Sequence, residues 1–199
     1  QAANRAEELY QRMQKRLAEL DMEKMISPLP PLVVGGALVV PRGLLNRLTG
    51  NVSPGMFGEG NRQAVEEAAM RAVMAIEASL GYIPRDVSKE KRGYDIESNI
   101  PEEKRKENNH CLRFLEVKGR AKGATTVTVT KNEILVALNK PEEFILAIVE
   151  VDGEKTDVVY LKRPFKTAPD FGATSVNYNI SDLMSASEIV LQRAGVLSE

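Results

Sequence analysis

The sequence predicts an α/β domain with a central mixed sheet flanked by helices, preceded by a helical and apolar arm. Apolar residues recur at helical spacing between Asn61 and Leu80. Three short strand-like segments follow, at residues 83–88, 94–97 and 111–119. A second helical segment then lies between further strand-like segments, and this alternation is typical of a sheet with helices on its faces. We therefore expect an arm and linker over residues 1–60 and the α/β domain over residues 61–199.

The composition excludes several classes of protein. A chain of 199 residues, 43% of them hydrophobic, suffices for one domain with an appendage and argues against general disorder. One Cys and one His exclude an internal disulfide and a zinc site of the Cys/His type within the chain. With 27 basic and 28 acidic residues, the chain lacks the strong basic excess of a histone-like nucleic-acid binder. A single Cys fits a reducing, cytoplasmic environment.

The first 60 residues predict an arm that packs on a partner. Residues 5–25 place Leu9, Met13, Leu17 and Leu20 on one stripe of an amphipathic helix. The apolar run 32–40, interrupted by two glycines, predicts a hairpin or one strand and is too short to span a membrane. Residues 41–60 are rich in glycine and predict a linker or mobile loop. Because the chain begins at Gln1 and enters a charged helix at once, we expect a piece of a longer polypeptide.

Local signals define the elements of the α/β domain. Asn61 is a candidate N-cap and Gly81 a candidate C′ residue for the first helix. Thr130 and Glu133 form the capping-box pattern of a second helix, which Pro141 ends. The remaining expected segments are a polar insert at 99–110, strands at 125–129, 144–151 and 158–161, a hairpin turn at Asp152-Gly153, a polar connection at 166–179, and a last helix from Ser181 with Leu183, Ala186, Ile189 and Val190 on its apolar side.

The segment 111–119 carries the residues with the clearest chemical potential. Strand alternation places Glu116 and Lys118 on the same face, together with Leu112 and Phe114. In the preceding strand, Asp95 points away from its two apolar neighbours. Side by side, these strands would bring two carboxylates and a lysine to one edge of a sheet, which suits Mg²⁺ bound by carboxylates and substrate phosphate. The alternative is a surface ion pair of little energetic consequence, and the spacing alone does not decide between them.

The order of elements and four short segments carry a family resemblance. The segments are GYDIES at 93–98, FLEVKG at 114–119, TKNE at 130–133 and RPF at 163–165. Together they resemble the helicase-associated domain of unknown function also called the NO VEIN C-terminal domain, which is grouped with the PD-(D/E)xK restriction-endonuclease-like nucleases. The resemblance runs from about Asn61 to about Ser187. Residues 26–40 resemble the linker that precedes this domain in Swi/Snf-type helicases.

The resemblance implies roles for individual residues. Asp95 and Glu116 would be metal ligands for Mg²⁺ or Mn²⁺, and Lys118 the catalytic lysine. Related nucleases often add a carboxylate from the preceding helix, and Glu77 is the best match in this chain. A solvent-exposed helix face is the alternative for Glu77. Glu66 and Glu67 lie three turns farther back and are expected at the surface.

Four further residues are candidates for contacts with nucleic acid. Arg120 and Lys122 lie in a basic, glycine-containing segment directly after the Glu-x-Lys strand. Lys131 and Asn132 begin the second helix, and backbone amides at a helix N-terminus favour phosphate. A plain turn and the capping box are the alternatives at these two places. The polar insert between Asp95 and Glu116 leaves open whether their strands pair in the required register.

The function expected from these observations is Mg²⁺-dependent cleavage of DNA by a domain at the C-terminal end of a larger helicase. DNA and the helicase motor region of the same polypeptide would be its partners, with no membrane. The alternative is a catalytically inactive DNA-binding or partner-docking domain of a helicase. A third hypothesis, a purely structural interaction module, would leave Asp95, Glu116 and Lys118 dispersed.

Overall fold

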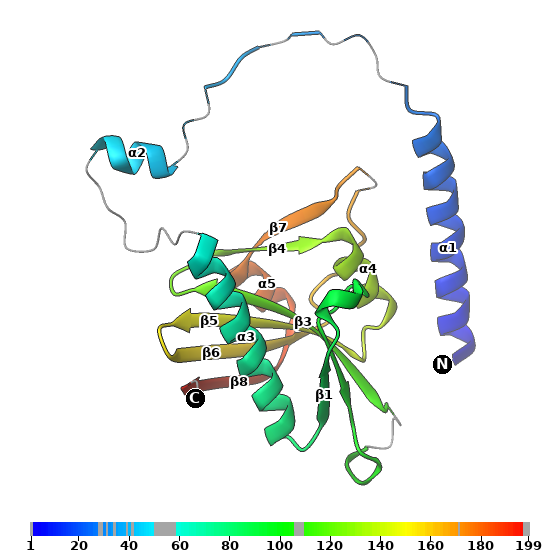
Figure 1. Ribbon diagram of the computed structural model, residues 1–199. Helices are drawn as coiled ribbons and strands as arrows, with labels where there is room; N and C mark the ends of the chain where they lie inside the picture. The colour runs from blue at the N-terminus through cyan, green and yellow to red at the C-terminus, as the bar shows by residue number, and fades with distance from the viewer. Residues whose placement is uncertain are drawn as a thin grey trace. The chain divides into compact units, whose positions relative to one another are not determined.

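The computed structural model describes residues 2–27, 30, 32–33, 35–38, 40, 42–49, 59–105, 110–170 and 172–196 (Figure 1). The chain divides into two units, Gln1–Met56 and Phe57–Glu199. Every candidate residue named above for catalysis, metal binding or nucleic-acid binding lies in the second unit. None of the helices in the described ranges is both long enough and apolar enough to cross a membrane.

The described residues of the first unit form two helices. α1 (Ala2–Lys24) confirms the amphipathic helix expected there, and α2 (Arg42–Thr49) corrects the expectation of a loop. The spacing of Leu44, Leu45 and Leu48 is helical, and this local pattern outweighs the glycine content of the surrounding segment. The described residues of the run 32–40 form neither a hairpin nor a strand. The remainder of that run, and residues 50–58 of the expected linker, lie outside the described residues.

The second unit is built on a six-stranded sheet in the order β1-β2-β3-β5-β6-β8 (Figure 1). Its strands are β1 (Ile83–Asp86), β2 (Ile96–Asn99), β3 (Leu112–Ala121), β5 (Phe144–Asp152), β6 (Lys155–Lys162) and β8 (Glu188–Val196). β3 and β5 are parallel, and all other neighbouring pairs are antiparallel. The central mixed sheet expected from the sequence is therefore confirmed.

A helix covers each face of this sheet. α3 (Glu59–Ser79) packs Ala69 and Val73 against Leu115 of β3 on one face. α4 (Lys131–Asn139) packs Ile134 against Phe114 of β3 on the other. Since Phe114 and Leu115 are consecutive in one strand, their side chains enter opposite apolar layers. This two-layer burial fixes which residues of β3 face α4, and Glu116 and Lys118 belong to that set.

A two-stranded sheet lies outside the main sheet. β4 (Thr126–Thr130) pairs antiparallel with β7 (Ser175–Asn179), as Figure 1 shows. β4 leads into α4 through the expected capping box, in which Thr130 Oγ1 accepts from Glu133 N and Glu133 Oε2 accepts from Thr130 N. The expected strand and helix start are confirmed here. The β5–β6 hairpin also forms as expected, with Gly153 at φ +62° in its turn.

Two expectations for the C-terminal part were wrong. The connection 166–179 contains β7, because Val176 and Tyr178 alternate with polar residues and pack inward on the apolar layer beside α4. The last helix, α5 (Ile180–Ala186), is shorter than expected and is followed by β8. Ile189 and Val190 are β-branched, and pairing with β6 outweighs the helical spacing that placed them on α5.

Gly119 permits close packing of α3 on β3. A Cβ atom at this position would lie 2.9 Å from Ala69 Cβ and 2.9 Å from the Val65 carbonyl oxygen. We expect Gly119→Ala to lower the free energy of unfolding by about 1 to 3 kcal/mol, because the helix must shift to admit the methyl group. Urea denaturation measures the effect. Gly172→Ala, with nothing within 4 Å of the added Cβ, is the control and should change stability far less.

Candidate functional site

The pairing of β2 with β3 brings Asp95, the residue directly before β2, close to Glu116. Ile96 pairs with Leu115 and Glu97 with Phe114. Asp95 directly precedes β2, and its N–H donates to the Leu115 carbonyl at 2.9 Å. Asp95 and Glu116 line the same pocket, so their carboxylates lie on the same side of the sheet. The polar insert between the two strands therefore does not disturb their register.

Asp95 directly precedes β2, and its carboxylate contacts the backbone of β3. The Val117 N–H donates to Asp95 Oδ2 at 2.9 Å, and the Asp95 carbonyl accepts from Val87 N at 2.8 Å. The first bond orients the carboxylate, and the second fixes the main chain of Asp95. Asp95 is thus held by main-chain groups on two sides.

Asp95, Glu116 and Lys118 line one pocket of about 640 Å³. Its wall comes from α3, β1, β3, β4, α4 and the loop between β1 and β2. Six acidic and three basic side chains line it, a formal balance of −3: Glu66, Glu67, Asp86, Asp95, Glu116 and Glu133 against Arg62, Lys118 and Arg120. A pocket with this balance attracts cations and repels a phosphate unless a cation is also present.

Lys118 lies between two carboxylates. Its Nζ is 2.6 Å from Glu116 Oε1 and 2.7 Å from Glu133 Oε2. The Lys118 side chain is 14% exposed, and those of Glu116 and Glu133 are 5% and 13% exposed. Because Glu133 is fixed in turn by the N-terminus of α4, the ammonium is held in one position.

Burial dominates the protonation of the site. It raises the pKa of Glu116 to about 8, and the nearby Asp95 and Glu133 carboxylates add to the rise against the opposing effect of Lys118. Burial also raises the pKa of Asp95, while the bond from Val117 opposes it. For Glu133, burial is outweighed by Lys118 and the Thr130 bonds, which together lower its pKa. The three carboxylates therefore differ in charge preference although they face one lysine.

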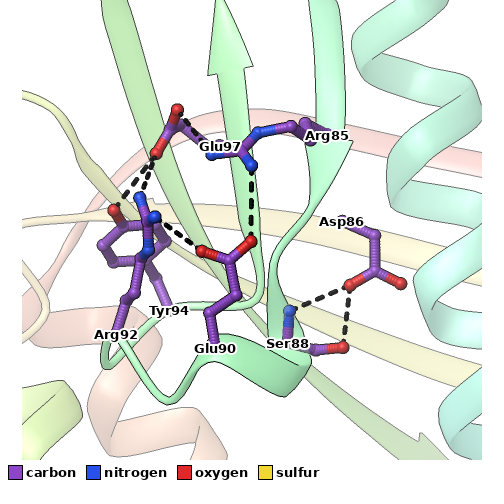
Figure 2. A network of polar contacts seen from close by, with 7 residues as sticks. All are labelled: Arg85, Asp86, Ser88, Glu90, Arg92, Tyr94 and Glu97. Atoms are coloured by element: carbon purple, nitrogen blue, oxygen red, sulfur yellow. Dashed lines mark hydrogen bonds and ion pairs between the residues drawn. The ribbon is translucent and has the colours of Figure 1, made fainter.

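Polar contacts brace the loop between β1 and β2, which carries Asp95. Figure 2 shows a closed set of ion pairs in which Arg85 and Arg92 each contact both Glu90 and Glu97. Asp86 accepts from the N–H and the hydroxyl of Ser88 at the start of this loop (Figure 2). Gly93, at φ +83°, lets the loop approach α4, since a Cβ there would lie 2.8 Å from Asn132 Nδ2. The loop is thus fixed between the strand ends and α4.

The candidates for contacts with nucleic acid separate into two groups. Arg120 lines the pocket, donates from Nη1 to the Gly119 carbonyl at 2.8 Å and from Nε to the Thr126 carbonyl at 3.1 Å. Lys122, Lys131 and Asn132 are not among the residues that line it. Lys122 is exposed and pairs with Asp152 at 2.7 Å. Of the four candidates, the structure brings Arg120 to the carboxylates.

The structure does not bring Glu77 to this pocket. Glu77 is fully buried on the α3 face of the sheet, where its Oε1 lies 3.4 Å from Nη2 of Arg113. The Arg113 guanidinium lies over the Tyr82 ring, 5.0 Å from its centroid. Burial raises the pKa of Glu77, against the effects of Arg113, Ser98 and Tyr160. The expected alternative, a solvent-exposed helix face, does not describe Glu77 either.

Other acidic residues line the pocket in its place. α3 presents Glu66 and Glu67 at its N-terminal end, and β1 ends at Asp86. Both glutamates are exposed, as expected from the sequence. Sequence reasoning missed two features of this pocket. It did not single out Asp86, and it explained Glu133 by helix capping alone, without the contact to Lys118. The one available signal for Asp86 was its place at the end of a strand beside the Asp95 strand.

The donor set fits a hard cation with a small number of protein ligands. Within the described ranges no group of three or more His, Cys, Asp or Glu side chains is arranged to hold a metal ion. Asp95 and Glu116 supply carboxylate oxygens on one face of the pocket. Mg²⁺ is commonly held by one or two carboxylates and completes its octahedral shell with water and substrate phosphate. Asp95 and Glu116 are therefore the residues that could hold such a cation.

Comparison with known proteins bears on the same segment. Residues 65–161 match a family model described as Protein NO VEIN, C-terminal. This match spans α3 through β6 and so includes Asp95, Glu116, Lys118 and Glu133. No curated protein and no solved structure gives a significant match. The NO VEIN C-terminal match supports the corresponding part of the resemblance drawn from the sequence.

Proposed function

We propose that residues 61–199 form a Mg²⁺-dependent nuclease domain that hydrolyses DNA phosphodiesters in the cytoplasm as part of a larger helicase. The observation that carries the proposal is that Asp95, Glu116 and Lys118 line one pocket of formal charge −3, with Lys118 Nζ 2.6 Å from Glu116 Oε1. The element order around these residues is a helix, three antiparallel strands, the outlying strand β4, a helix and a strand parallel to the third. Apart from β4, this is the order of the PD-(D/E)xK nucleases, which the sequence resembles.

Each charged side chain of the pocket has a separate role in the proposed reaction. Mg²⁺ or Mn²⁺ would neutralise the phosphate and lower the pKa of a bound water. Asp95 and Glu116 would hold the cation; a main-chain bond orients the Asp95 carboxylate, and Glu116 is buried. Lys118 would donate toward the water or the oxygen on which negative charge develops. Glu133, 2.7 Å from the Lys118 ammonium, would keep it in position.

The proposed reaction is a simple hydrolysis. A water oxygen forms a new bond to phosphorus, the bond from phosphorus to one sugar oxygen breaks, and one proton of the water reaches that oxygen. The products are a phosphomonoester and an alcohol, and no oxidant or reductant is needed.

The test is cleavage of DNA by the full chain. Plasmid, linear and branched DNA are incubated with Mg²⁺ or Mn²⁺, and we expect Glu116→Ala and Lys118→Ala to cut at least about 100-fold more slowly than wild type. Glu154→Ala and Lys155→Ala make the same changes on the exposed β5–β6 turn and should cut normally. Equal rates of cleavage by wild type and the pocket variants would mean that a contaminating nuclease cuts the DNA, and would disprove the proposal.

The alternative function is a catalytically inactive DNA-binding or partner-docking domain. It is favoured by the two short ion pairs of Lys118, which occupy the ammonium in the absence of a cation. Metal-dependent DNA binding by wild type without any cleavage would select the DNA-binding form of this alternative. The helicase attachment rests on the resemblance alone, and helicase motifs in the codons upstream of Gln1 would support it.

A further inference from the structure

The β4–β7 ribbon has one face made entirely of neutral polar side chains. The inward residues Val127 and Val129 are buried in the apolar layer beside α4. The outward residues are all exposed and pair across the strands: Thr126 with Asn179, Thr128 with Asn177, and Thr130 with Ser175. Six hydroxyl and amide side chains therefore form one continuous face without a carboxylate or an ammonium group.

This face runs directly into the pocket. Thr128 and Thr130 line the pocket together with Asp95, Glu116 and Lys118. At the other end of β4, the Arg120 Nε donates to the Thr126 carbonyl, so a guanidinium from the pocket wall lies against the ribbon. Four residue steps of β4, from Thr126 to Thr130, extend the wall by about 13 Å at the usual rise of a strand.

The chemistry of this face suits a phosphodiester backbone. Thr, Ser and Asn side chains are common donors to phosphate oxygens in protein–DNA contacts, and such contacts position the duplex without reading its sequence. The pocket carries a formal charge of −3, so a carboxylate on the adjoining face would repel an incoming strand. Exposed strands are ordinarily protected by charged residues, especially Lys. The outward face of this ribbon has none.

We propose that the β4–β7 ribbon is the track along which the DNA backbone next to the scissile phosphate enters the pocket. The proposal rests on the proposed nuclease function for the identity of the substrate. Two of the six side chains also cap helices: Thr130 caps α4, and Asn179 Oδ1 accepts from Ser181 N and Asp182 N of α5. Changes at Thr126, Thr128, Ser175 and Asn177 leave both caps intact.

The hydrogen bond between Thr128 and Asn177 orients the Asn177 amide on the proposed track. Thr128 Oγ1 donates to Asn177 Oδ1 at 3.2 Å. This bond uses the amide oxygen as the acceptor, so the amide NH₂ of Asn177 is the group presented as a donor. Phosphate oxygens accept hydrogen bonds, and the orientation therefore matches the proposed ligand.

The experiment measures equilibrium binding of a labelled DNA duplex with Mg²⁺, in the Lys118→Ala background so that the DNA is not cut. In this background we expect Thr126→Lys to bind several-fold more tightly and to steepen the dependence of log K on log salt by about 0.9, the contribution of one phosphate contact. Thr126→Glu should weaken binding at least fivefold. The double variant Thr126→Val/Thr128→Val should weaken it about tenfold, with an unchanged melting curve, because valine keeps the shape and strand preference of threonine.

Matched charge changes elsewhere separate a local track from a general charge effect. Gln192 is an exposed, neutral residue of β8, and Gln192→Lys and Gln192→Glu should each change affinity less than twofold. Equal shifts from residues 126 and 192 would overturn the proposal, as would a failure of the Lys118→Ala protein to bind DNA. Stronger binding of an RNA duplex of the same sequence would overturn the assignment to DNA.

The outcomes also distinguish this proposal from the nuclease proposal. Binding that responds to residue 126, in a protein that never cuts, supports the track and removes the nuclease function. Cutting by the wild-type protein, with affinity insensitive to Thr126 and Thr128, supports the nuclease function and removes the track.

Discussion

Replacing Glu116 with Gln is expected to stabilise the metal-free protein at pH 8 and to leave its stability nearly unchanged near pH 5. Glu116 is 4% exposed, and burial raises its pKa from 4.5 to about 8. The folded state therefore holds the proton of this carboxyl more tightly than the unfolded chain does. The free energy of unfolding accordingly falls as the pH rises from about 4.5 to about 8, and this group contributes a loss on the order of 5 kcal/mol. Gln carries no charge, so the variant does not lose this free energy of unfolding as the pH rises.

Melting curves in a chelator between pH 5 and pH 8.5 measure this difference. Glu133→Gln is the matched control with the opposite expected sign at pH 8. The pKa of Glu133 is lowered, so its charged form stabilises the fold above its unfolded pKa. Lys118 adds no slope in this range, because its raised pKa stabilises the folded state fully below about 10.5. A Glu116→Gln protein that melts below wild type at pH 8 would contradict the prediction.

Added Mg²⁺ links this stability to the proposed function. A cation that binds the folded state raises its melting temperature by mass action. At pH 8, Mg²⁺ should raise the melting temperature of wild type more than that of Glu116→Gln, because the cation offsets the free-energy cost of burying the ionised carboxylate. An equal gain in both proteins would mean that Glu116 does not take part in binding the cation.

The sequence predicted the parts of the fold that local chemistry determines. Alternation assigned Glu116 and Lys118 to one face of β3, and the capping pattern located the start of α4 at Thr130 and Glu133. Both signals depend on neighbours within a few residues along the chain. The mixed sheet followed from the order of helices and strands, which restricts the possible connections.

Long-range pairing determined what the sequence did not reveal. The apolar residues of β8 have helical spacing. The segment is a strand because it pairs with the edge of β6. The register of β2 on β3 decided that Asp95, just before β2, lies close to Glu116, and the polar insert gave no local indication of it. The displacement of Glu77 from the pocket has a similar origin. Helical periodicity predicts which residues of α3 share one face. The packing of α3 across the sheet decides which turns of the helix line the pocket.

The buried pair of Glu77 and Arg113 provides the second large expected effect. Glu77→Leu should lower the free energy of unfolding by about 3 to 5 kcal/mol, because it leaves the Arg113 charge buried without its partner. The double variant Glu77→Leu/Arg113→Met should recover most of that loss, since no charge remains and Met can fill the space against Tyr82 and Tyr160. Urea denaturation of the single and double variants at pH 7 gives the coupling energy.

Additive losses in this cycle would contradict the pairing. The same variants also decide between the two roles considered for Glu77. In the double variant, at a temperature where it is fully folded, DNA cleavage should stay within about twofold of wild type, because Glu77 lies outside the residues that line the pocket. A metal ligand behaves differently, since its removal costs activity even when stability is restored. Loss of cleavage in a folded, restored double variant would therefore return Glu77 to the metal site.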